Sequence, residues 1–297
     1  MHFPILGLVA AFLTALCQTA SDIGAKAATR EAEQRLILAT QWLAGGLLLT
    51  LVCLAANPEL LRRPLDDFLR ADFYPTLVAG GLLNLVAHYF YVRAFRLSDA
   101  SLVAPVILLT PVLLLVTSPL MLGEQVSPLG GVGVLLSVAG AALLGRREAG
   151  APLAASFGAL ASDAGVRSMF VTAVLWSITA NMDKIGVRAS SPLIWIAALS
   201  DFIAASAVLF YLAGPRQPFS LWETRYAGAS GAANAIGNAL QMYALTLLFV
   251  PYVIAIKRLS GLFTVLASSL IFKEDVRDRL LAAFIMLMGA ALIAFAR

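Results

Sequence analysis

Ten long apolar runs dominate the chain and constrain its fold more than any other feature. Because a helix of about 20 apolar residues crosses a bilayer core about 30 Å thick, each run predicts one transmembrane helix. Hydrophobic residues make up 60% of the 297 positions and charged residues 13%, whereas a soluble domain is about half apolar and about a quarter charged. We therefore predict an all-α polytopic membrane protein with ten transmembrane helices. The runs cover residues 3–23, 36–56, 73–95, 101–122, 129–144, 168–185, 193–213, 226–248, 250–272 and 280–295.

The composition also excludes several classes of protein. The net charge is +4, but the basic residues stand in short clusters between the apolar runs, where membrane topology explains them and nucleic acid is not needed. Cys17 and Cys53 both lie inside apolar runs, so they suggest neither a disulfide framework nor a metal site. We predict no cofactor. No basic segment precedes the first run, which we interpret as a transmembrane helix and not as a cleaved signal peptide.

The two halves of the chain share a pattern of polar and glycine residues, which are rare in apolar runs. Five residues of the first half match residues 150 positions later in the second half: Gly81, Asn84, His88, Tyr91 and Glu124 match Gly231, Asn234, Asn238, Gln241 and Glu274. We expect a first five-helix repeat over residues 1–148, a linker over 149–166 and a second five-helix repeat over 167–297. Since five is an odd number, the copies are expected to be inverted in the membrane. Inverted repeats are typical of secondary transporters, whose substrate site lies near the bilayer midplane.

A family resemblance follows from this pattern. The five-plus-five spans, the runs that end in Gly123-Glu124 and Lys273-Glu274, and the glycine-rich segments 130–133 and 288–291 resemble the EamA-type drug/metabolite transporter superfamily. Members carry amino acids, nucleotide sugars, sugar phosphates, choline-like cations and drugs, so the resemblance leaves the substrate open. It implies that both termini lie in the cytoplasm. The positive-inside rule gives the opposite orientation, because 13 Lys and Arg are assigned to the odd-numbered loops between runs and six to the even-numbered loops and the C-terminus, with Arg93 and Lys184, at the ends of their runs, counted as loop residues. Orientation stays open.

Lys257 and Arg258 lie well inside the run 250–272. A cation in hydrocarbon costs about 3 kcal/mol on insertion scales, so such a pair is expected to face a wet cavity or an anion. The alternative is that both side chains snorkel to the interface. The pair is also similar to the Lys-Arg pair with which plastid phosphate translocators of the superfamily hold phosphate. Those relatives place a further lysine in the span that matches the run 101–122, where this chain has Ile107.

Polar stripes mark two other spans. Asn84, His88 and Tyr91 are spaced i, i+4 and i+7, and so are Asn234, Asn238 and Gln241. Each set lies on one helix face, as the two walls of a wet cavity would require, although interhelical hydrogen bonds worth about 0.6 kcal/mol each are the alternative. His88 is either part of a proton step or a hydrogen-bonded neutral ring. The full set of predicted substrate-binding residues is Lys257, Arg258, Asn84, His88, Tyr91, Asn234, Asn238, Gln241, Lys184 and Gln18.

Four acidic residues are predicted to act in gating or ion pairs: Asp201, Asp22, Glu124 and Glu274. Asp201 lies near the middle of the run 193–213, where a carboxylate is expected to be paired, protonated or wet. Lys257, Arg258 and Lys184 are its candidate partners, and without a partner it becomes a candidate for proton coupling. Asp22 is placed at a cavity mouth. Glu124 and Glu274 end matched spans and are expected to anchor the turns that follow.

These features predict a secondary transporter of the cell membrane, which is the inner membrane if the source is prokaryotic. It would move a small metabolite, such as an amino acid or an organic or sugar phosphate, by alternating access through a central cavity. We expect a small-molecule substrate, membrane lipid and a proton as the candidate coupling ion, and no nucleic acid. The alternatives are an exporter of cationic drugs and a lipid-headgroup flippase. An intramembrane enzyme is disfavoured, because the chain lacks His-Glu-x-x-His and Gly-x-Ser-x-Gly motifs. Direction of transport and oligomeric state stay open.

Overall fold

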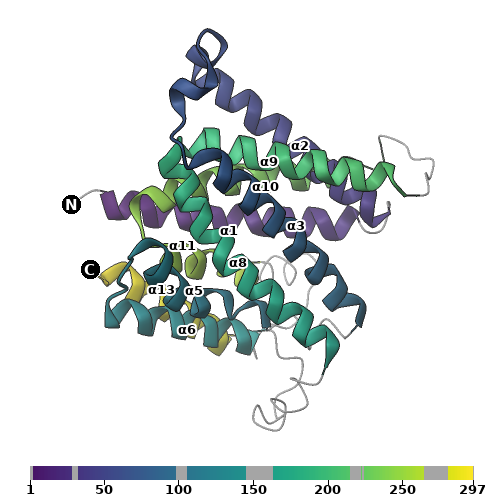
Figure 1. Cartoon of the computed structure of the whole chain (residues 1–297). Helices are drawn as coiled ribbons and strands as arrows, with labels where there is room; N and C mark the ends of the chain where they lie inside the picture. The colour runs from purple at the N-terminus through teal and green to yellow at the C-terminus, as the bar shows by residue number, and fades with distance from the viewer. Residues whose placement is uncertain are drawn as a thin grey trace. The chain divides into compact units, whose positions relative to one another are not determined.

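The computed structural model is helical, and it describes residues 3–28, 33–97, 106–144, 163–214, 222, 224–263 and 280–296. Those ranges contain ten α-helices and two 3-10 helices, and they contain no strand. The prediction of an all-α polytopic membrane protein is confirmed. The elements, labelled in Figure 1 where space allows, are α1 (Phe3–Ala28), α2 (Gln34–Ala56), η1 (Pro58–Leu61), η2 (Leu65–Phe68), α3 (Phe73–Leu97), α5 (Thr110–Leu122), α6 (Pro128–Leu144), α8 (Ala164–Ala189), α9 (Pro192–Leu212), α10 (Arg225–Leu247), α11 (Val250–Lys257) and α13 (Leu280–Phe295).

Most helix bounds follow the predicted runs closely. The last helix spans Leu280–Phe295, as predicted, and α9 begins and ends one residue before its predicted run. By length and composition, three described helices hold segments apolar enough to cross a membrane: Ile5–Ala25, Arg35–Ala56 and Pro192–Leu212. The helices α3, α8 and α10 are as long, with 25, 26 and 23 residues, but they carry more polar side chains. These three helices therefore hold much of the chain's intramembrane polarity.

The chain forms two compact units, and each takes residues from both halves of the sequence. The first unit comprises Met1–Gly81 and Asp183–Leu247, and the second comprises Leu82–Met182 and Leu248–Arg297. The units therefore do not coincide with the repeats expected at 1–148 and 167–297, which remain a prediction about the sequence. The unit boundaries fall within α3 and α8 and between α10 and α11.

In the first unit, small residues let neighbouring helices approach closely. Helix α1 packs along α10, and α2 packs along α9 and α10 (Figure 1). At Gly237 of α10, a Cβ atom would lie 2.9 Å from the Cβ atom of Cys17 on α1. Thr14 of α1 also donates a hydrogen bond to the carbonyl oxygen of Gly237, at 3.1 Å. Membrane helices pack through such small-residue contacts, because the hydrophobic effect does not drive helices together in lipid.

In the second unit, α6 packs along α13, and α5 and α6 pack against α11. Helices α6 and α13 approach each other closely at Gly133, where a Cβ atom would lie 2.8 Å from the carbonyl oxygen of Gly289. Since a side chain on either residue would force the backbones apart, these glycines determine the spacing of the two helices. A further glycine, Gly130, gives room for the ring of Tyr252 on α11.

Two predictions about helix continuity are wrong, because turns at residues 108–109 and 258–259 interrupt the runs 101–122 and 250–272. The run 250–272 was expected to be one helix, but α11 ends at Lys257 and a tight turn at residues 258–259 precedes the next helical residues, 260–263. At this turn the N–H of Leu259 donates to the carbonyl oxygen of Ile256, at 3.0 Å. This i→i+3 bond replaces the α-helical pattern, and such turns within a helix often mark hinges.

The same turn occurs 150 positions earlier. Residues 108–109 form a tight turn before α5, and the N–H of Leu109 donates to the carbonyl oxygen of Val106, at 3.1 Å. The hydroxyl of Thr110 also donates to the carbonyl oxygen of Ile107, at 2.7 Å. The two halves of the sequence therefore share this backbone turn as well as the matched polar residues.

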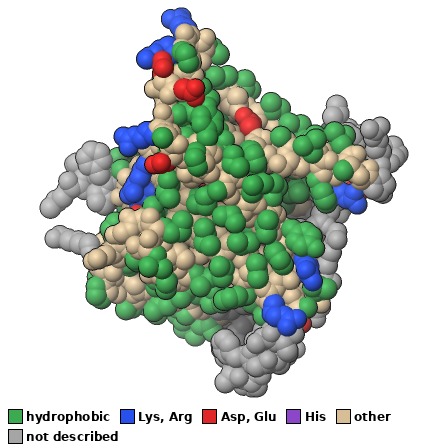
Figure 2. Space-filling view, viewed as in Figure 1, with side chains coloured by type: hydrophobic (Ala, Val, Ile, Leu, Met, Phe, Trp, Pro, Cys, Tyr) green, Lys and Arg blue, Asp and Glu red, His purple; other side chains and the backbone are tan. Residues whose placement is uncertain are grey.

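The surface is as apolar as the sequence implies. In the face shown in Figure 2, hydrophobic side chains cover most of the helices, and charged side chains gather toward the margins. Large apolar residues such as Leu51, Leu120 and Leu209 are 66%, 80% and 67% exposed. Apolar side chains exposed on this scale are expected where lipid is the solvent.

Candidate functional site

The turn after α11 holds the two cations that the sequence singles out. Residues Val250 to Ile256 of α11 are all buried, and the helix then ends at Lys257, with Arg258 as its C-cap. Both cationic side chains are half-buried. The C-terminal end of a helix carries partial negative charge, so cations there are stabilised by the helix. The two consecutive positive charges therefore lie at the end of a buried helix.

The start of α11 is fixed by Glu124. This residue follows the last turn of α5 and Gly123, whose φ of 68° lies in the left-handed region. The carboxylate oxygen Oε2 of Glu124 accepts a hydrogen bond from the N–H of Val250, the first residue of α11, at 2.9 Å. Glu124 is only 4% exposed. An acidic group at a helix N-terminus both caps an N–H and complements the helix dipole. Glu124 therefore anchors α11, and through it the turn that carries the cations.

The predicted polar stripe of α3 lies in the same unit, together with a partner that the sequence did not reveal. His88 Nδ1 is 2.8 Å from the carbonyl oxygen of Asn84. Trp176 of α8 packs against both rings of the stripe, with centroids 5.7 Å from His88 and 5.4 Å from Tyr91. Asn84, His88, Tyr91 and Trp176 are all half-buried. The stripe is therefore a mixed aromatic and amide surface, which can contact both apolar and hydrogen-bonding parts of a ligand.

A second polar group of this unit also escaped the sequence analysis. Asn181 of α8 is fully buried, and its amide donates to Thr117 Oγ1 at 3.0 Å and to the carbonyl oxygen of Ser177 at 2.9 Å. Its carbonyl oxygen accepts from Ser118 Oγ at 2.7 Å. These bonds join α8 to α5 within the apolar interior. Because every polar atom of the amide finds a partner, Asn181 acts as a structural link.

The other predicted binding residues lie in the first unit. Gln18 donates to Asp22 Oδ1 at 2.8 Å, so these two residues of α1 act as one polar group. On α10, Asn234 and Asn238 are half-buried and Gln241 is buried. Lys184, near the end of α8, is only 6% exposed. The structure thus groups Gln18, Asp22, Lys184, Asp201, Asn234, Asn238 and Gln241 in one unit and Lys257, Arg258, Asn84, His88, Tyr91 and Glu124 in the other.

Asp201 contacts a hydroxyl group. Its Oδ2 accepts a hydrogen bond from Thr50 Oγ1 of α2, at 2.6 Å. Among the described residues of its own unit it forms no ion pair, so Lys184 is not its partner there, and the other two candidates, Lys257 and Arg258, belong to the second unit. The fourth predicted gating residue, Glu274, lies outside the described residues.

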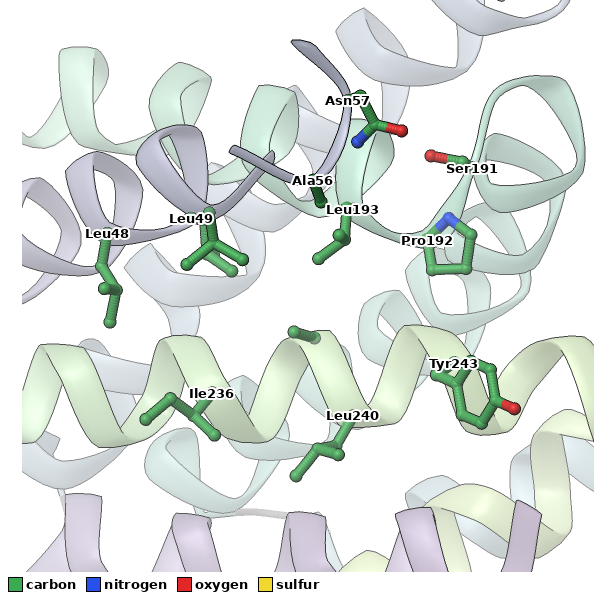
Figure 3. A pocket seen from close by; sticks show the side chains of 12 residues that line it. Leu48, Leu49, Ala56, Asn57, Ser191, Pro192, Leu193, Ile236, Leu240 and Tyr243 are labelled. Atoms are coloured by element: carbon green, nitrogen blue, oxygen red, sulfur yellow. The ribbon is translucent and has the colours of Figure 1, made fainter. Parts of the chain in front are cut away.

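A pocket of about 720 Å³ lies in the first unit and is apolar in character. Leu48 and Leu49 of α2 line one side and Ile236 and Leu240 of α10 line another, while Asn57 and Ser191 lie together at one end (Figure 3). The pocket contains none of the predicted binding residues. A charged solute would lose its hydration in this pocket and gain only apolar contacts, which is unfavourable, so the pocket does not suit an anion.

The apolar helices carry half-buried cations and amides, together with the buried carboxylate of Glu124. These features fit a polytopic membrane protein of the transporter class. The chain belongs to the EamA-like transporter family, whose model matches residues 5–146 and again 163–296. The predicted family is confirmed. A similar curated protein is the uncharacterized transporter YvbV of Bacillus subtilis (strain 168), with 30% identity over 186 residues. That alignment covers 62% of this chain and 55% of the relative, so the chain matches about half of the relative's length.

The fold also resembles a solved structure. A protein of known crystal structure aligns with a TM-score of 0.74 and 20% sequence identity, over 96% of this chain and 95% of its own. At that identity the likeness concerns the fold alone. The family match is what identifies an integral membrane protein of a transporter family.

Proposed function

We propose that the protein is a secondary transporter that moves a small anionic metabolite across the cell membrane by alternating access. The solute would be an amino acid or an organic or sugar phosphate, and Lys257 and Arg258 would bind its acidic group. The supporting observation is the turn at residues 258–259, which puts two adjacent cations at the end of a buried helix. Its counterpart at residues 108–109 has Ile107 and Leu108 in the matching positions. The cations are therefore not a general requirement of the turn.

Anion binding gives these cations a physical role. A cation within a membrane span costs about 3 kcal/mol on insertion scales, and a solute carboxylate or phosphate would offset that cost. Arginine presents a planar set of donors that matches carboxylate and phosphate oxygens, and lysine adds a compact charge. The amide and aromatic groups of Asn84, His88 and Tyr91 would then contact the rest of the solute.

The two matched turns also suggest how the helices could bend. Alternating access requires elements that change their backbone angles while the helices around them stay intact. An i→i+3 turn already lacks one α-helical hydrogen bond, so it bends at lower cost than a regular helix. Thr110 supports the turn before α5 by donating to the carbonyl oxygen of Ile107. We assign the two turns as hinges of the transport cycle.

The test is solute uptake by the purified full-length protein in liposomes. A thermal-shift screen over metabolite classes first finds solutes that stabilise the protein, since ligands of the folded state raise its apparent stability. Labelled hits are then followed into liposomes and recovered for chemical identification. An anionic solute that accumulates unchanged, and fails to do so with Lys257→Gln, supports the proposal. A cationic drug as the only transported solute, a lipid as cargo, or a chemically altered solute would each contradict it.

Arg188→Gln is the matched control for Lys257→Gln. Arg188 lies in the last turn of α8, as Lys257 lies in the last turn of α11, but its side chain is exposed. Both variants remove one positive charge from a helix C-terminus and therefore lose a similar dipole interaction. Uptake of the anion should be lost in Lys257→Gln and kept in Arg188→Gln.

A further inference from the structure

We infer that Asp201 is a proton-binding group of the transport cycle, held by Thr50 and Gly46 between α9 and α2. The inference rests on the proposed function, because it names the ion that the transporter would couple to its solute. Asp201 is the tenth residue of α9, a helix of 21 residues, so it lies near the middle of a membrane span. Carboxylic acids at that depth commonly mark proton relays in pumps and transporters.

The two carboxyl oxygens of Asp201 have different surroundings. Oδ2 accepts the hydrogen bond from Thr50 Oγ1, at 2.6 Å. Oδ1 packs over Gly46, one helical turn before Thr50 on α2, where a Cβ atom would lie only 2.6 Å away. Within the described residues Oδ1 has no hydrogen-bond partner. The proton therefore belongs on Oδ1, while Oδ2 stays bonded to the hydroxyl in both the neutral and the charged form.

No cation from the part of the chain that the structure describes bonds to this carboxyl group. The side chain is exposed, and the helices on either side present apolar residues: Leu47 and Leu51 of α2 are 56% and 66% exposed, and Leu209 of α9 is 67% exposed. A charged carboxylate is unfavourable in such a setting. Taking up a proton removes that charge without any protein partner. The carboxyl group can therefore bind and release a proton as its access to water changes during transport.

Other titratable or charged groups on the neighbouring elements do not bond to Asp201. Cys53 of α2 interacts with Asp201 electrostatically, without a hydrogen bond between them. Arg35 of α2 stacks on the ring of Phe210, 5.5 Å from its centroid. The remaining groups make no hydrogen bond or ion pair with Asp201 in the described chain; they are Tyr74 of α3, Asp183, Lys184 and Arg188 of α8, and Arg225, Tyr226 and Tyr243 of α10.

The oxygen set favours a proton over a metal ion. Two carboxylate oxygens and one hydroxyl converge here, whereas hard cations such as Ca²⁺ and Mg²⁺ take about six or more oxygens. The described residues also contain no group of three or more His, Cys, Asp and Glu side chains that could hold a metal ion. A proton needs only one free oxygen, which Oδ1 provides.

The test uses carbodiimide labelling of the full-length protein in liposomes, followed by peptide mass spectrometry. A hydrophobic carbodiimide reacts with a protonated carboxyl group in an apolar setting, so it should modify Asp201, and the modification should fall as the medium is made alkaline. Thr50→Val removes the hydroxyl that donates to Oδ2, so the extent of labelling at one pH should change. Thr50→Ser keeps the hydroxyl and should restore the wild-type profile. Labelling that is absent, or that does not change with pH, would overturn the inference.

Two glycine variants separate local geometry from folding. Gly46→Ala places a methyl group where Oδ1 lies and should reduce labelling severalfold. Gly228→Ala adds a methyl group where no atom lies within 4 Å, so labelling should match the wild type. Equal labelling in both variants would contradict the assignment of Oδ1.

A flux measurement then ties the site to transport. In liposomes, a pH gradient should drive solute accumulation by the wild type, and Asp201→Asn should abolish that accumulation while keeping solute exchange. Labelling of Asp201 without any solute transport would refute the proposed transporter and leave the proton site standing. Transport that ignores the pH gradient would refute the proton site and leave the transporter standing.

Discussion

The carboxylate of Glu124 accepts a hydrogen bond from the backbone N–H of Val250, at 2.9 Å, although the two residues lie 126 positions apart in the chain. Glu124 follows the end of α5, and Val250 begins α11, whose far end carries Lys257 and Arg258. One buried side chain therefore joins the first half of the chain to the helix that presents the candidate anion site.

Replacing this carboxylate should destabilise the protein. Loss of an N-terminal cap costs about 1 kcal/mol, so Glu124→Ala should lower the apparent melting temperature in detergent. Glu124→Gln keeps an acceptor oxygen but loses the charge that complements the helix dipole, and its effect should be smaller. Glu59→Gln is the control, because Glu59 is exposed in η1. If Glu124→Ala and Glu59→Gln melt alike, the bond to Val250 does not stabilise α11.

The Asn181 group should behave as a unit. Asn181→Ala leaves the hydroxyls of Thr117 and Ser118 without their amide partner in the apolar interior, at a cost of about 1–3 kcal/mol. The triple variant Asn181→Leu, Thr117→Val and Ser118→Ala removes all three polar groups together and should recover most of that loss, because matched apolar replacements are nearly neutral. Thermal unfolding of the two variants decides this. A triple variant less stable than Asn181→Ala would mean that size, and not polarity, governs the site.

Two glycines of α10, three residues apart, should respond oppositely to the same substitution. A Cβ atom at Gly231 would collide with the carbonyl oxygen of Gln41 on α2, whereas one at Gly228 would meet no atom within 4 Å. Gly231→Ala should therefore separate α10 from α2 and lower stability. Gly228→Ala should be neutral or stabilising by up to about 1 kcal/mol, since alanine favours the helix. Melting temperatures measured in one detergent give the comparison, and equal shifts would argue against close packing at Gly231.

Most of the helices could be predicted from the sequence, because a helix that crosses the membrane needs a long run of apolar residues. The run 280–295 became Leu280–Phe295. Glu124 was expected to anchor the turn into the following helix, but the bond that the structure shows is to the N–H of Val250, at the start of α11. The turn after Lys257 could not be predicted from hydropathy, because residues 250–272 are apolar on both sides of it. The available signal was the pair of weak helix formers Pro111 and Gly261, which stand 150 positions apart just after the two turns.

Partners on different helices were harder to predict. Asp201 bonds to Thr50, and the rings of His88 and Tyr91 pack against Trp176, but neither Thr50 nor Trp176 stands out in its own span. Spacing within one helix identifies residues on the same face, as for Asn84, His88 and Tyr91. It gives no register between two helices, which depends on packing contacts such as that of Gly46 with Asp201.

The central claim is that Lys257 recognises the negative charge of the solute, and charge discrimination measures this most directly. In liposomes, half-saturating concentrations are compared for the anionic solute and its neutral amide, with wild-type protein, Lys257→Gln and Arg188→Gln. A hydrogen bond to a charged group contributes about 1.5–3 kcal/mol, which corresponds to about ten- to hundredfold in affinity. The wild type and Arg188→Gln should prefer the anion by at least tenfold, and Lys257→Gln should lose that preference. An unchanged preference in Lys257→Gln would contradict the account.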